Sequence, residues 1–244
     1  MTEYALIGYP LVHSFSRQYF TDKFERDGTD ARYLNWEMES VDGLVETIKA
    51  HPQLKGLNVT IPHKQAVMPL LTAVSDEALA IGAVNCIKIG RRPFSLTGYN
   101  TDVIGFERSI QPLLQPHHKK ALVLGTGGAS KAVVYGLKKL GIEPTLVSRA
   151  PDNNILGYSA LSREVMADHT VIVNCTPLGT FPNVDTCPSI PYNYIGTRHL
   201  LYDLVYNPGK TLFLQKGEVR GATVKNGLEM LHLQAEAGWE IWKL

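Results

Sequence analysis

A glycine-rich turn between two apolar segments is the first stretch whose residue types and spacing suggest chemistry. Residues 121–124 are apolar without interruption, which predicts a short buried parallel strand. The turn at 125–130 follows, and apolar residues then recur at helical spacing up to Gly141, where a helix C-cap belongs. Glycines let the backbone approach a pyrophosphate, and a helix N-terminus offers N–H groups to it. The stretch therefore predicts the first half of a dinucleotide-binding unit, although Ser130 stands at the last position of the G-x-G-x-x-G pattern.

Arg149 indicates which dinucleotide this unit takes. An NAD site usually has Asp or Glu at the end of the second strand, where the carboxylate bonds the ribose 2′-OH. Here the second predicted strand, 145–148, is followed by Arg149, which can grip a 2′-phosphate with two N–H bonds. The alternative is a solvated arginine after a strand. Because no carboxylate competes for this position, the sequence favours NADP over NAD.

Polar residues also follow several other predicted strands. In an open α/β sheet, ligands bind beyond the carboxyl ends of the strands, so this placement favours a binding site. Each residue also has a structural explanation, because serine and aspartate cap helices and a lone lysine is usually at the surface. The strand-end residues are His13, Ser14, Ser16, Asn58, Thr60, Lys64, Asn85, Asn100, Thr101 and Asp102.

Strand-like and helix-like segments alternate along the first hundred residues, which predicts an α/β fold with a largely parallel sheet. A proline at the first turn of a helix is favourable, so Pro62 predicts a helix that carries Val67, Leu70 and Leu71. The other predicted elements are strands at 4–8, 33–36, 56–60, 84–88 and 94–97, and helices at 16–27, 41–50 and 77–81.

The rest of the chain contains the dinucleotide-binding unit and ends in a helix. Residues 176–198 are rich in Pro, Gly and Asn, which predicts a segment that is mostly loop. The predicted elements besides those around the glycine turn are helices at 103–115 and 227–242, and strands at 170–174 and 200–204. The last helix carries an apolar stripe that includes Leu228, Leu231 and Ala235.

Composition restricts the function classes. The 244 residues suffice for two modest domains, and the net charge of +1 gives no electrostatic footprint for nucleic acid or an anionic membrane. No apolar run has transmembrane length, and the N-terminus lacks a signal-like core. The three cysteines, Cys86, Cys175 and Cys187, are odd in number and not in C-x-x-C spacing, which suggests a reducing cytoplasm. The histidines form no H-E-x-x-H pattern, so we expect no metal.

Eight motifs in order along nearly the whole chain resemble the shikimate dehydrogenase family. One of these motifs alone is weak, whereas eight in the family's order are highly specific. The matching stretches are 8–16, 58–64, 81–85, 100–102, 125–130, 174–179, 203–208 and 227–234.

The resemblance implies NADP-dependent, reversible reduction of 3-dehydroshikimate to shikimate, a step of chorismate and aromatic amino acid biosynthesis. It implies that Lys64 and Asp102 are the catalytic pair, and that Ser14 and Ser16 hold the substrate carboxylate. The residues that it implies for the substrate's hydroxyls and orientation are Thr60, Asn85, Tyr206 and Gln234. The residues that it implies for the cofactor are Thr126, Gly127, Gly128, Ala129, Ser130, Ser148, Arg149, Leu204 and Gly227.

The resemblance also implies two domains. Residues 1–102 form a substrate-binding catalytic domain with a mostly parallel sheet, which the C-terminal helix 226–244 rejoins. Residues 103–225 form a Rossmann-like NADP-binding domain. We expect a cytoplasmic monomer or homodimer that binds small molecules, with neither nucleic acid nor membrane as a partner.

The sequence departs from the family pattern at a few positions, and two other functions stay open. Arg17, His63, Val103 and Thr180 replace the family's usual proline, phenylalanine, small residue and methionine. One alternative is a quinate/shikimate dehydrogenase that uses NAD, which an acidic residue at 149 would have favoured. The other is a non-catalytic NADP- and ligand-sensing protein, which the loss of Lys64 or Asp102 would have indicated.

Overall fold

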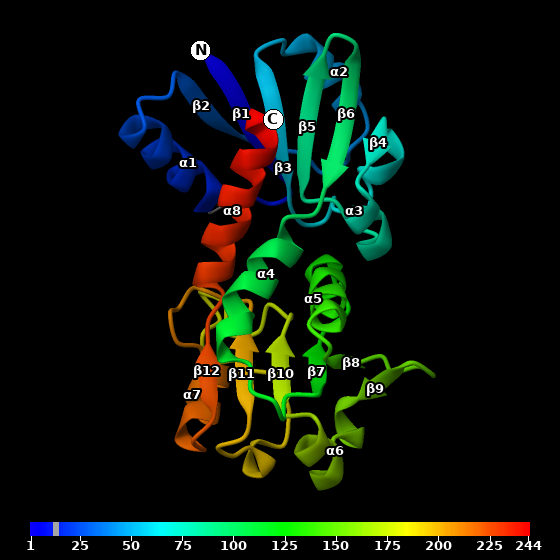
Figure 1. The fold of residues 1–244 in the computed structure, drawn as a ribbon, viewed down its shortest axis with the longest axis vertical. Helices are drawn as coiled ribbons and strands as arrows, with labels where there is room; N and C mark the ends of the chain where they lie inside the picture. Colours follow the sequence, from blue (N-terminus) through cyan, green and yellow to red (C-terminus); the bar gives the residue numbers. More distant parts are fainter. Residues whose placement is uncertain (12–14) are drawn as a thin grey trace. The chain divides into compact units, whose positions relative to one another are not determined.

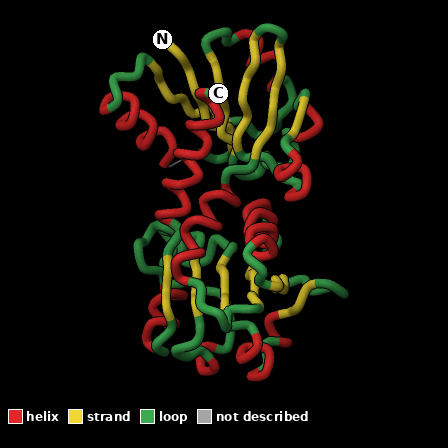
Figure 2. The backbone as a smooth tube through the Cα atoms, in the orientation of Figure 1, coloured by secondary structure: helices red, strands yellow, loops and turns green. Residues whose placement is uncertain are grey.

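The chain folds into two compact α/β units, as a computed structural model that describes residues 1–11 and 15–244 shows (Figure 1). The first unit comprises Met1–Thr101 and Ala235–Leu244, and the second comprises Asp102–Gln234. Each unit has its own six-stranded sheet, and helices alternate with strands along the chain in both (Figure 2). This architecture confirms the predicted α/β class.

The first unit has a mixed sheet in the order β2-β1-β3-β5-β6-β4. Strand β1 is parallel to β2 and to β3, whereas β5 is antiparallel to β3 and to β6. The strands are β1 Thr2–Gly8, β2 Ala31–Glu37, β3 Leu54–Val59, β4 Ala73–Val74, β5 Cys86–Arg91 and β6 Phe94–Tyr99. The helices are α1 Phe15–Arg26, α2 Leu44–Ala50 and α3 Asp76–Ile81, with the short 3-10 helix η1 Met68–Leu70.

Both faces of the first sheet are buried, because alternate residues of a strand point to opposite faces. On β1, Ala5 and Ile7 pack in one apolar core with α2, while Tyr4 and Leu6 pack in another with α1 and the end of α8. Trp242 belongs to the second of these cores, and its indole Nε1 donates a hydrogen bond to the Ile87 carbonyl oxygen at 3.1 Å. The C-terminal helix is thereby fixed to the first sheet.

The predicted helix after Pro62 is wrong. Residues 61–67 form a run of turns, and only Met68–Leu70 is helical, as a 3-10 helix. The His63 amide bonds the Thr60 carbonyl oxygen and the Met68 amide bonds the Gln65 carbonyl oxygen, both over the short interval of a turn. Pro69 lacks an amide hydrogen, so it cannot extend an α-helical ladder.

The second unit has a fully parallel sheet in the order β12-β11-β10-β7-β8-β9. Its strands are β7 Lys120–Leu124, β8 Glu143–Ser148, β9 Ile155–Gly157, β10 Val171–Asn174, β11 Leu200–Asp203 and β12 Thr223–Lys225. Its helices are α4 Asp102–Ile110, α5 Gly128–Lys139, α6 Arg163–Asp168 and α7 Leu212–Val219, with 3-10 helices η2 Gln111–Leu113, η3 Tyr158–Ala160 and η4 Tyr192–Tyr194.

Helix α8, Leu228–Lys243, spans the division between the units, which falls between Gln234 and Ala235. In the second unit, residues of α4 and α5 share one core with Ala121 and Val123, while α6 and α7 share another with Leu122 and Leu124. The alternation along β7 shows why its residues are apolar without interruption: helices cover both faces of the sheet.

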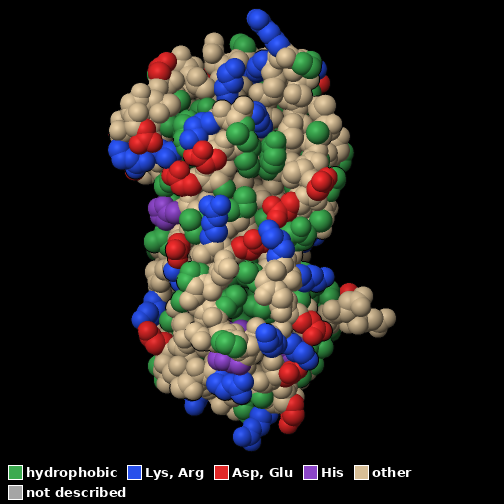
Figure 3. Space-filling model, viewed as in Figure 1, with side chains coloured by type: hydrophobic (Ala, Val, Ile, Leu, Met, Phe, Trp, Pro, Cys, Tyr) green, Lys and Arg blue, Asp and Glu red, His purple; other side chains and the backbone are tan. Residues whose placement is uncertain are grey.

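Charged side chains of both signs are interspersed over the face seen in Figure 3, in keeping with the net charge of +1. No helix formed by residues 1–11 and 15–244 is long and apolar enough to cross a membrane.

Candidate active site

The predicted substrate residues of the first unit lie where strands end or begin at one edge of its sheet. Ser16 is in the first turn of α1, which follows β1, and Thr60 directly follows β3. Asn85 precedes β5, and because β5 is antiparallel to β3, its beginning lies beside the end of β3. The Val59 amide bonds the Asn85 carbonyl oxygen at 2.8 Å. The predicted residue Ser14 lies outside the described residues.

Close backbone packing brings the ends of β1 and β3 together at this edge. A Cβ atom on Gly8, the last residue of β1, would lie 2.4 Å from Cγ2 of Thr60. Only glycine therefore fits at this position without displacing Thr60.

Lys64 lies in the run of turns after β3, and two hydrogen bonds, one at Lys64 and one at His63, hold this segment in place. Its carbonyl oxygen accepts a hydrogen bond from the Val84 amide at 2.8 Å. The neighbouring His63 is buried, and its Nε2 donates to the Met38 carbonyl oxygen at 2.6 Å. The Lys64 side chain itself is half-buried. The backbone of this loop is thus fixed around Lys64.

Asn85 uses its side-chain amide to hold the end of the first unit. Its Oδ1 accepts from the Thr101 amide at 2.7 Å, and its Nδ2 donates to the Thr101 hydroxyl at 3.0 Å. Asn85 is 3% exposed, so these bonds are shielded from water. Thr101 directly precedes Asp102, the first residue of α4, and Asn85 therefore fixes the peptide that leads to the predicted catalytic aspartate.

In the second unit, close packing of two helices brings Gln234 to the helix that begins at Asp102. A Cβ atom on Gly105 of α4 would lie 2.5 Å from the Met230 carbonyl oxygen and 3.1 Å from Cβ of Gln234. The absence of that atom lets α8 approach α4. Both Asp102 and Gln234 are buried, at 7% and 8% exposure.

The glycine turn has the features of a phosphate cradle. Gly125 has φ +107°, a conformation that favours glycine, and a Cβ there would approach Thr176 to 3.2 Å. Helix α5 begins after Gly127 with no side-chain cap and no acidic residue in its first turn, so its N–H groups suit an anion. The Ser130 hydroxyl donates to the Gly127 carbonyl oxygen at 2.6 Å and so stabilises the turn. These residues fit the pyrophosphate of a dinucleotide.

The end of β8 carries Arg149, the residue predicted to bind the 2′-phosphate and so to select NADP. Arg149 is exposed and directly follows the strand, while the Ser148 hydroxyl accepts from the Ala150 amide at 3.2 Å. Asp152 does not compete for the phosphate site in this geometry, because its carboxylate accepts from the Asn154 amide within its own turn, at 2.7 Å. The arrangement fits a 2′-phosphate better than a free 2′-hydroxyl.

The segment after β11 brings Leu204, Gly227 and Tyr206 to the carboxyl edge of the second sheet. A Cβ on Gly227 would lie 2.2 Å from the Leu204 carbonyl oxygen, so the two predicted cofactor residues are in direct backbone contact. Tyr206 is 36% exposed, and partial burial raises the pKa of its hydroxyl.

The sequence analysis gave no role to Asp203, which organises this edge. Its buried carboxylate accepts from the Thr211 hydroxyl at 2.5 Å, the Val205 amide at 3.0 Å and Nδ2 of Asn174 at 2.9 Å. Burial raises the pKa of Asp203 to about 6, against the lowering effect of these bonds. A carboxylate at the end of an apolar strand is the sequence signal that could have identified it.

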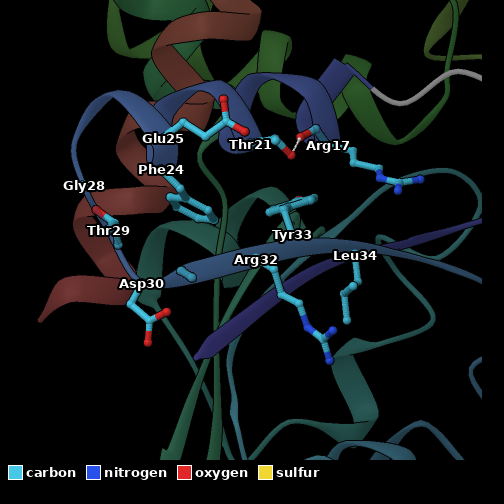
Figure 4. A pocket seen from close by; sticks show the side chains of 11 residues that line it. Arg17, Thr21, Phe24, Glu25, Gly28, Thr29, Asp30, Arg32, Tyr33 and Leu34 are labelled. Carbon is cyan, nitrogen blue, oxygen red and sulfur yellow. Dashed lines mark hydrogen bonds between the residues drawn. The ribbon is translucent and has the colours of Figure 1, made fainter.

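Tyr33 of the first unit also escaped the site prediction, and it bonds Asn58, one of the predicted strand-end residues. Tyr33 donates its hydroxyl proton to Oδ1 of Asn58 at 2.6 Å, and both residues are buried. A hollow of about 620 Å³ beside α1 and β2 is lined partly by Tyr33, Arg17 and Arg32 (Figure 4). None of the predicted site residues lines this hollow. Among residues 1–11 and 15–244, no cluster of three or more His, Cys, Asp or Glu is placed to hold a metal ion.

Comparison with known proteins identifies relatives over almost the whole chain. The family model "Shikimate dehydrogenase substrate binding domain" matches residues 6–87. A protein of Caldicellulosiruptor saccharolyticus named shikimate dehydrogenase (NADP(+)) is 32% identical, over 99% of this chain and 92% of its own length.

Two solved structures share the fold over the same extent. The shikimate dehydrogenase of Aquifex aeolicus is 33% identical with a TM-score of 0.87, and the match covers 99% of this chain and 92% of that one. The shikimate 5-dehydrogenase of Thermus thermophilus, solved in complex with NADP(H) and shikimate, is 29% identical with a TM-score of 0.86, covering 99% of this chain and 93% of that one.

Proposed function

Because the chain belongs to the shikimate dehydrogenase family, we propose that it catalyses the NADP-dependent, reversible reduction of 3-dehydroshikimate to shikimate. The observation that carries the proposal is the full-length similarity to proteins named for this activity, 32% for one of them. The strand-end residues of the first unit support it because their side chains suit a polar substrate. The glycine turn of the second unit supports it because it suits the pyrophosphate of the cofactor.

The cofactor supplies hydride transfer when bound, and the protein supplies orientation and one proton. A ketone that gains a hydride becomes an alkoxide. Lys64 donates a proton to that oxygen, and in the reverse direction it accepts the hydroxyl proton. Asp102 orients the lysine ammonium and accepts a hydrogen bond from the same substrate hydroxyl. The bonds that hold the Lys64 carbonyl and the Thr101 amide support these assignments, since they fix both backbones next to Asn85.

The substrate is held by hydroxyl and amide groups. We assign Ser14 and Ser16 to its carboxylate, because two hydroxyls two residues apart after a strand direct donors to one anion. The residues assigned to its hydroxyls and orientation are Thr60, Asn85, Tyr206 and Gln234. The first unit with the C-terminal helix is accordingly the substrate-binding domain, and the second unit is the NADP-binding domain.

The cofactor is held mainly by backbone groups. Residues 126–130 take the pyrophosphate at the N-terminus of α5, and Ser148 with Arg149 takes the adenosine 2′-phosphate. We assign Leu204 and Gly227 to the cofactor as well. The three cysteines are free, which supports a reducing cytoplasm as the site of action. The protein acts on small molecules as a monomer or homodimer.

The proposal is tested by following the absorbance of NADPH after addition of 3-dehydroshikimate. We expect oxidation of NADPH, and reduction of NADP with shikimate in reverse. Reverse assays with quinate and with NAD separate the reaction from that of an NAD-dependent quinate/shikimate dehydrogenase. Tight binding of NADPH and 3-dehydroshikimate without turnover would instead identify a ligand-sensing protein.

A further inference from the structure

A carboxylate near the C-terminus of the chain ties two helices of the first unit together. Glu236, in the part of α8 that belongs to this unit, accepts a hydrogen bond from the Tyr19 hydroxyl. The Lys23 ammonium bonds the same carboxylate, with Nζ 3.1 Å from Oε1 and 3.1 Å from Oε2. Tyr19 and Lys23 both belong to α1, which runs beside this part of α8 (Figure 1). A phenol and an ammonium of α1 thus share one carboxylate of α8.

The charges of this tie are matched where water has little access. Lys23 is 8% exposed, and a buried ammonium is costly unless a carboxylate pairs with it. Lys23 has two such partners, since Asp27 lies 3.4 Å away in addition to Glu236. Burial alone would raise the pKa of Glu236, but the bonds from Tyr19 and Lys23 outweigh that effect and hold the pKa below its usual range. Glu236 therefore stays ionised at neutral pH and accepts both bonds.

The tie lies on the face of α1 that also carries Ser16. Ser16, Tyr19 and Lys23 are three and four residues apart, the spacing that places side chains on one face of a helix. Phe20 and Phe24 lie on the adjoining face and pack in an aromatic core. Apolar burial has no preferred direction, whereas a hydrogen bond has a preferred distance and angle. The tie therefore fixes the rotation and the height of α1 on this core, one turn after Ser16.

We propose that Glu236 is a positioning residue, which acts through Tyr19 and Lys23 to hold Ser16 in place for the substrate carboxylate. This inference rests on the proposed function, in which Ser16 binds that carboxylate. A shift in the first turn of α1 would lengthen or bend the bond from the Ser16 hydroxyl and weaken it. Glu236 lies beyond the matching stretch 227–234, so the family resemblance implied no role for it. Glu236 itself takes no part in hydride or proton transfer.

The test compares Glu236→Ala with a matched control, Glu240→Ala. Glu240 is also on α8 and ion-paired, but its partner is Lys243 of the same helix, at 2.6 Å. We expect Glu236→Ala to raise the KM for shikimate roughly 2- to 12-fold, the factor for one neutral hydrogen bond, with kcat and the KM for NADP nearly unchanged. Partial unfolding would lower the apparent kcat instead. An unchanged KM for shikimate in Glu236→Ala overturns the proposal, as does an equal rise in Glu240→Ala.

A double-mutant cycle separates positioning from a general loss of stability. In a Ser16→Ala background, Glu236→Ala should raise the KM no further, because the residue it positions is gone. Fully additive effects overturn the proposal. Tyr19→Phe removes one bond of the tie but keeps the ring that stacks on Phe15 at 5.3 Å between centroids. It should also raise the KM, so it decides the question if Glu236→Ala does not fold. A wild-type protein that neither binds nor oxidises shikimate refutes the proposed function instead.

Discussion

The two units prepare their strand ends for ligands by different means. In the first unit, side chains bond side chains and carbonyls: Asn85 holds Thr101, and His63 holds Met38. In the second, glycines remove side chains so that backbone groups come close, as at Gly125 and Gly227. A substrate with a carboxylate and several hydroxyls requires donors and acceptors at fixed places, which side chains provide. A pyrophosphate requires only N–H groups and a favourable dipole, which backbone provides.

The two regions should also respond differently to amino-acid substitutions. A side-chain bond can be removed by one substitution with little change to the backbone around it. A glycine contact is broken by adding one carbon atom, and the backbone must then move. Substitutions in the first region should therefore change kinetics more than stability, and substitutions at glycines of the second region should change both.

The largest effect should come from Lys64→Ala. Proton transfer by a positioned side chain contributes about 10²–10⁴-fold, and kcat should fall by roughly that factor. The KM for shikimate should change less, since the lost interaction is strongest in the transition state. Steady-state kinetics in both directions measure this. Lys55→Ala removes an exposed lysine of the same unit and should leave kcat unchanged. Near-normal turnover in folded Lys64→Ala would exclude the lysine from proton transfer.

Arg149→Ala should have the next largest effect. The second unit is predicted to bind the cofactor mainly through backbone groups, whereas Arg149 would bind the 2′-phosphate through its side chain. A hydrogen bond to a charged group contributes about 1.5–3 kcal/mol, so the KM for NADP should rise roughly 10- to 100-fold. The KM for NAD, which has no 2′-phosphate, should stay constant. Arg163→Ala, which removes another exposed arginine of this unit, is the control. If the wild type uses NAD and NADP with equal efficiency, Arg149 does not select the cofactor.

Gly227→Ala tests the glycine contact directly. The added Cβ would lie 2.2 Å from the Leu204 carbonyl oxygen, so the backbone must shift. Overpacking of this kind costs about 1–3 kcal/mol, and both the thermal midpoint and NADP affinity should decrease. Gly196→Ala is the control, because its Cβ would meet no atom within 4 Å. A stable variant with normal NADP affinity would show that this close approach is dispensable.

The sequence predicted the second region better than the first for a physical reason. An apolar run, glycines and an amphipathic helix are local signals, so β7, the turn and α5 were predicted close to their observed bounds. The buried hydrogen bond of the first region joins Tyr33 and Asn58, which are 25 residues apart in the sequence. A tyrosine in a strand looks like an ordinary core residue. The helix predicted after Pro62 was wrong because Pro69 has no amide hydrogen for an α-helical hydrogen bond. The prediction relied on Pro62 as a signal for the start of a helix and gave less weight to Pro69.

The smallest expected effect concerns the opposite edge of the second unit, where buried His118 connects two loops. Its Nδ1 accepts from the Gln115 amide at 2.9 Å, and its Nε2 lies 3.2 Å from the Arg198 carbonyl oxygen, which can only accept. The bond from the Gln115 amide requires the neutral ring, because a protonated Nδ1 cannot accept. Burial lowers the pKa of His118, and the nearby His117, His199 and Arg198 lower it further, although the bond to the Arg198 carbonyl opposes them.

The sign of the pH dependence follows from that lowered pKa. The unfolded chain, with an ordinary histidine pKa of about 6.5, takes up a proton at a higher pH than the folded protein does. The stabilisation from neutral His118 is therefore complete above pH of about 6.5 and is lost as the pH falls toward the folded pKa. In His118→Gln, the free energy of unfolding should decrease less on acidification across this range than in the wild type. His51→Gln, at an exposed histidine of the first unit, should keep the wild-type slope. Urea titrations of all three proteins at a series of pH values measure the slopes, and equal slopes in His118→Gln and the wild type would show that this edge does not respond to acid through His118.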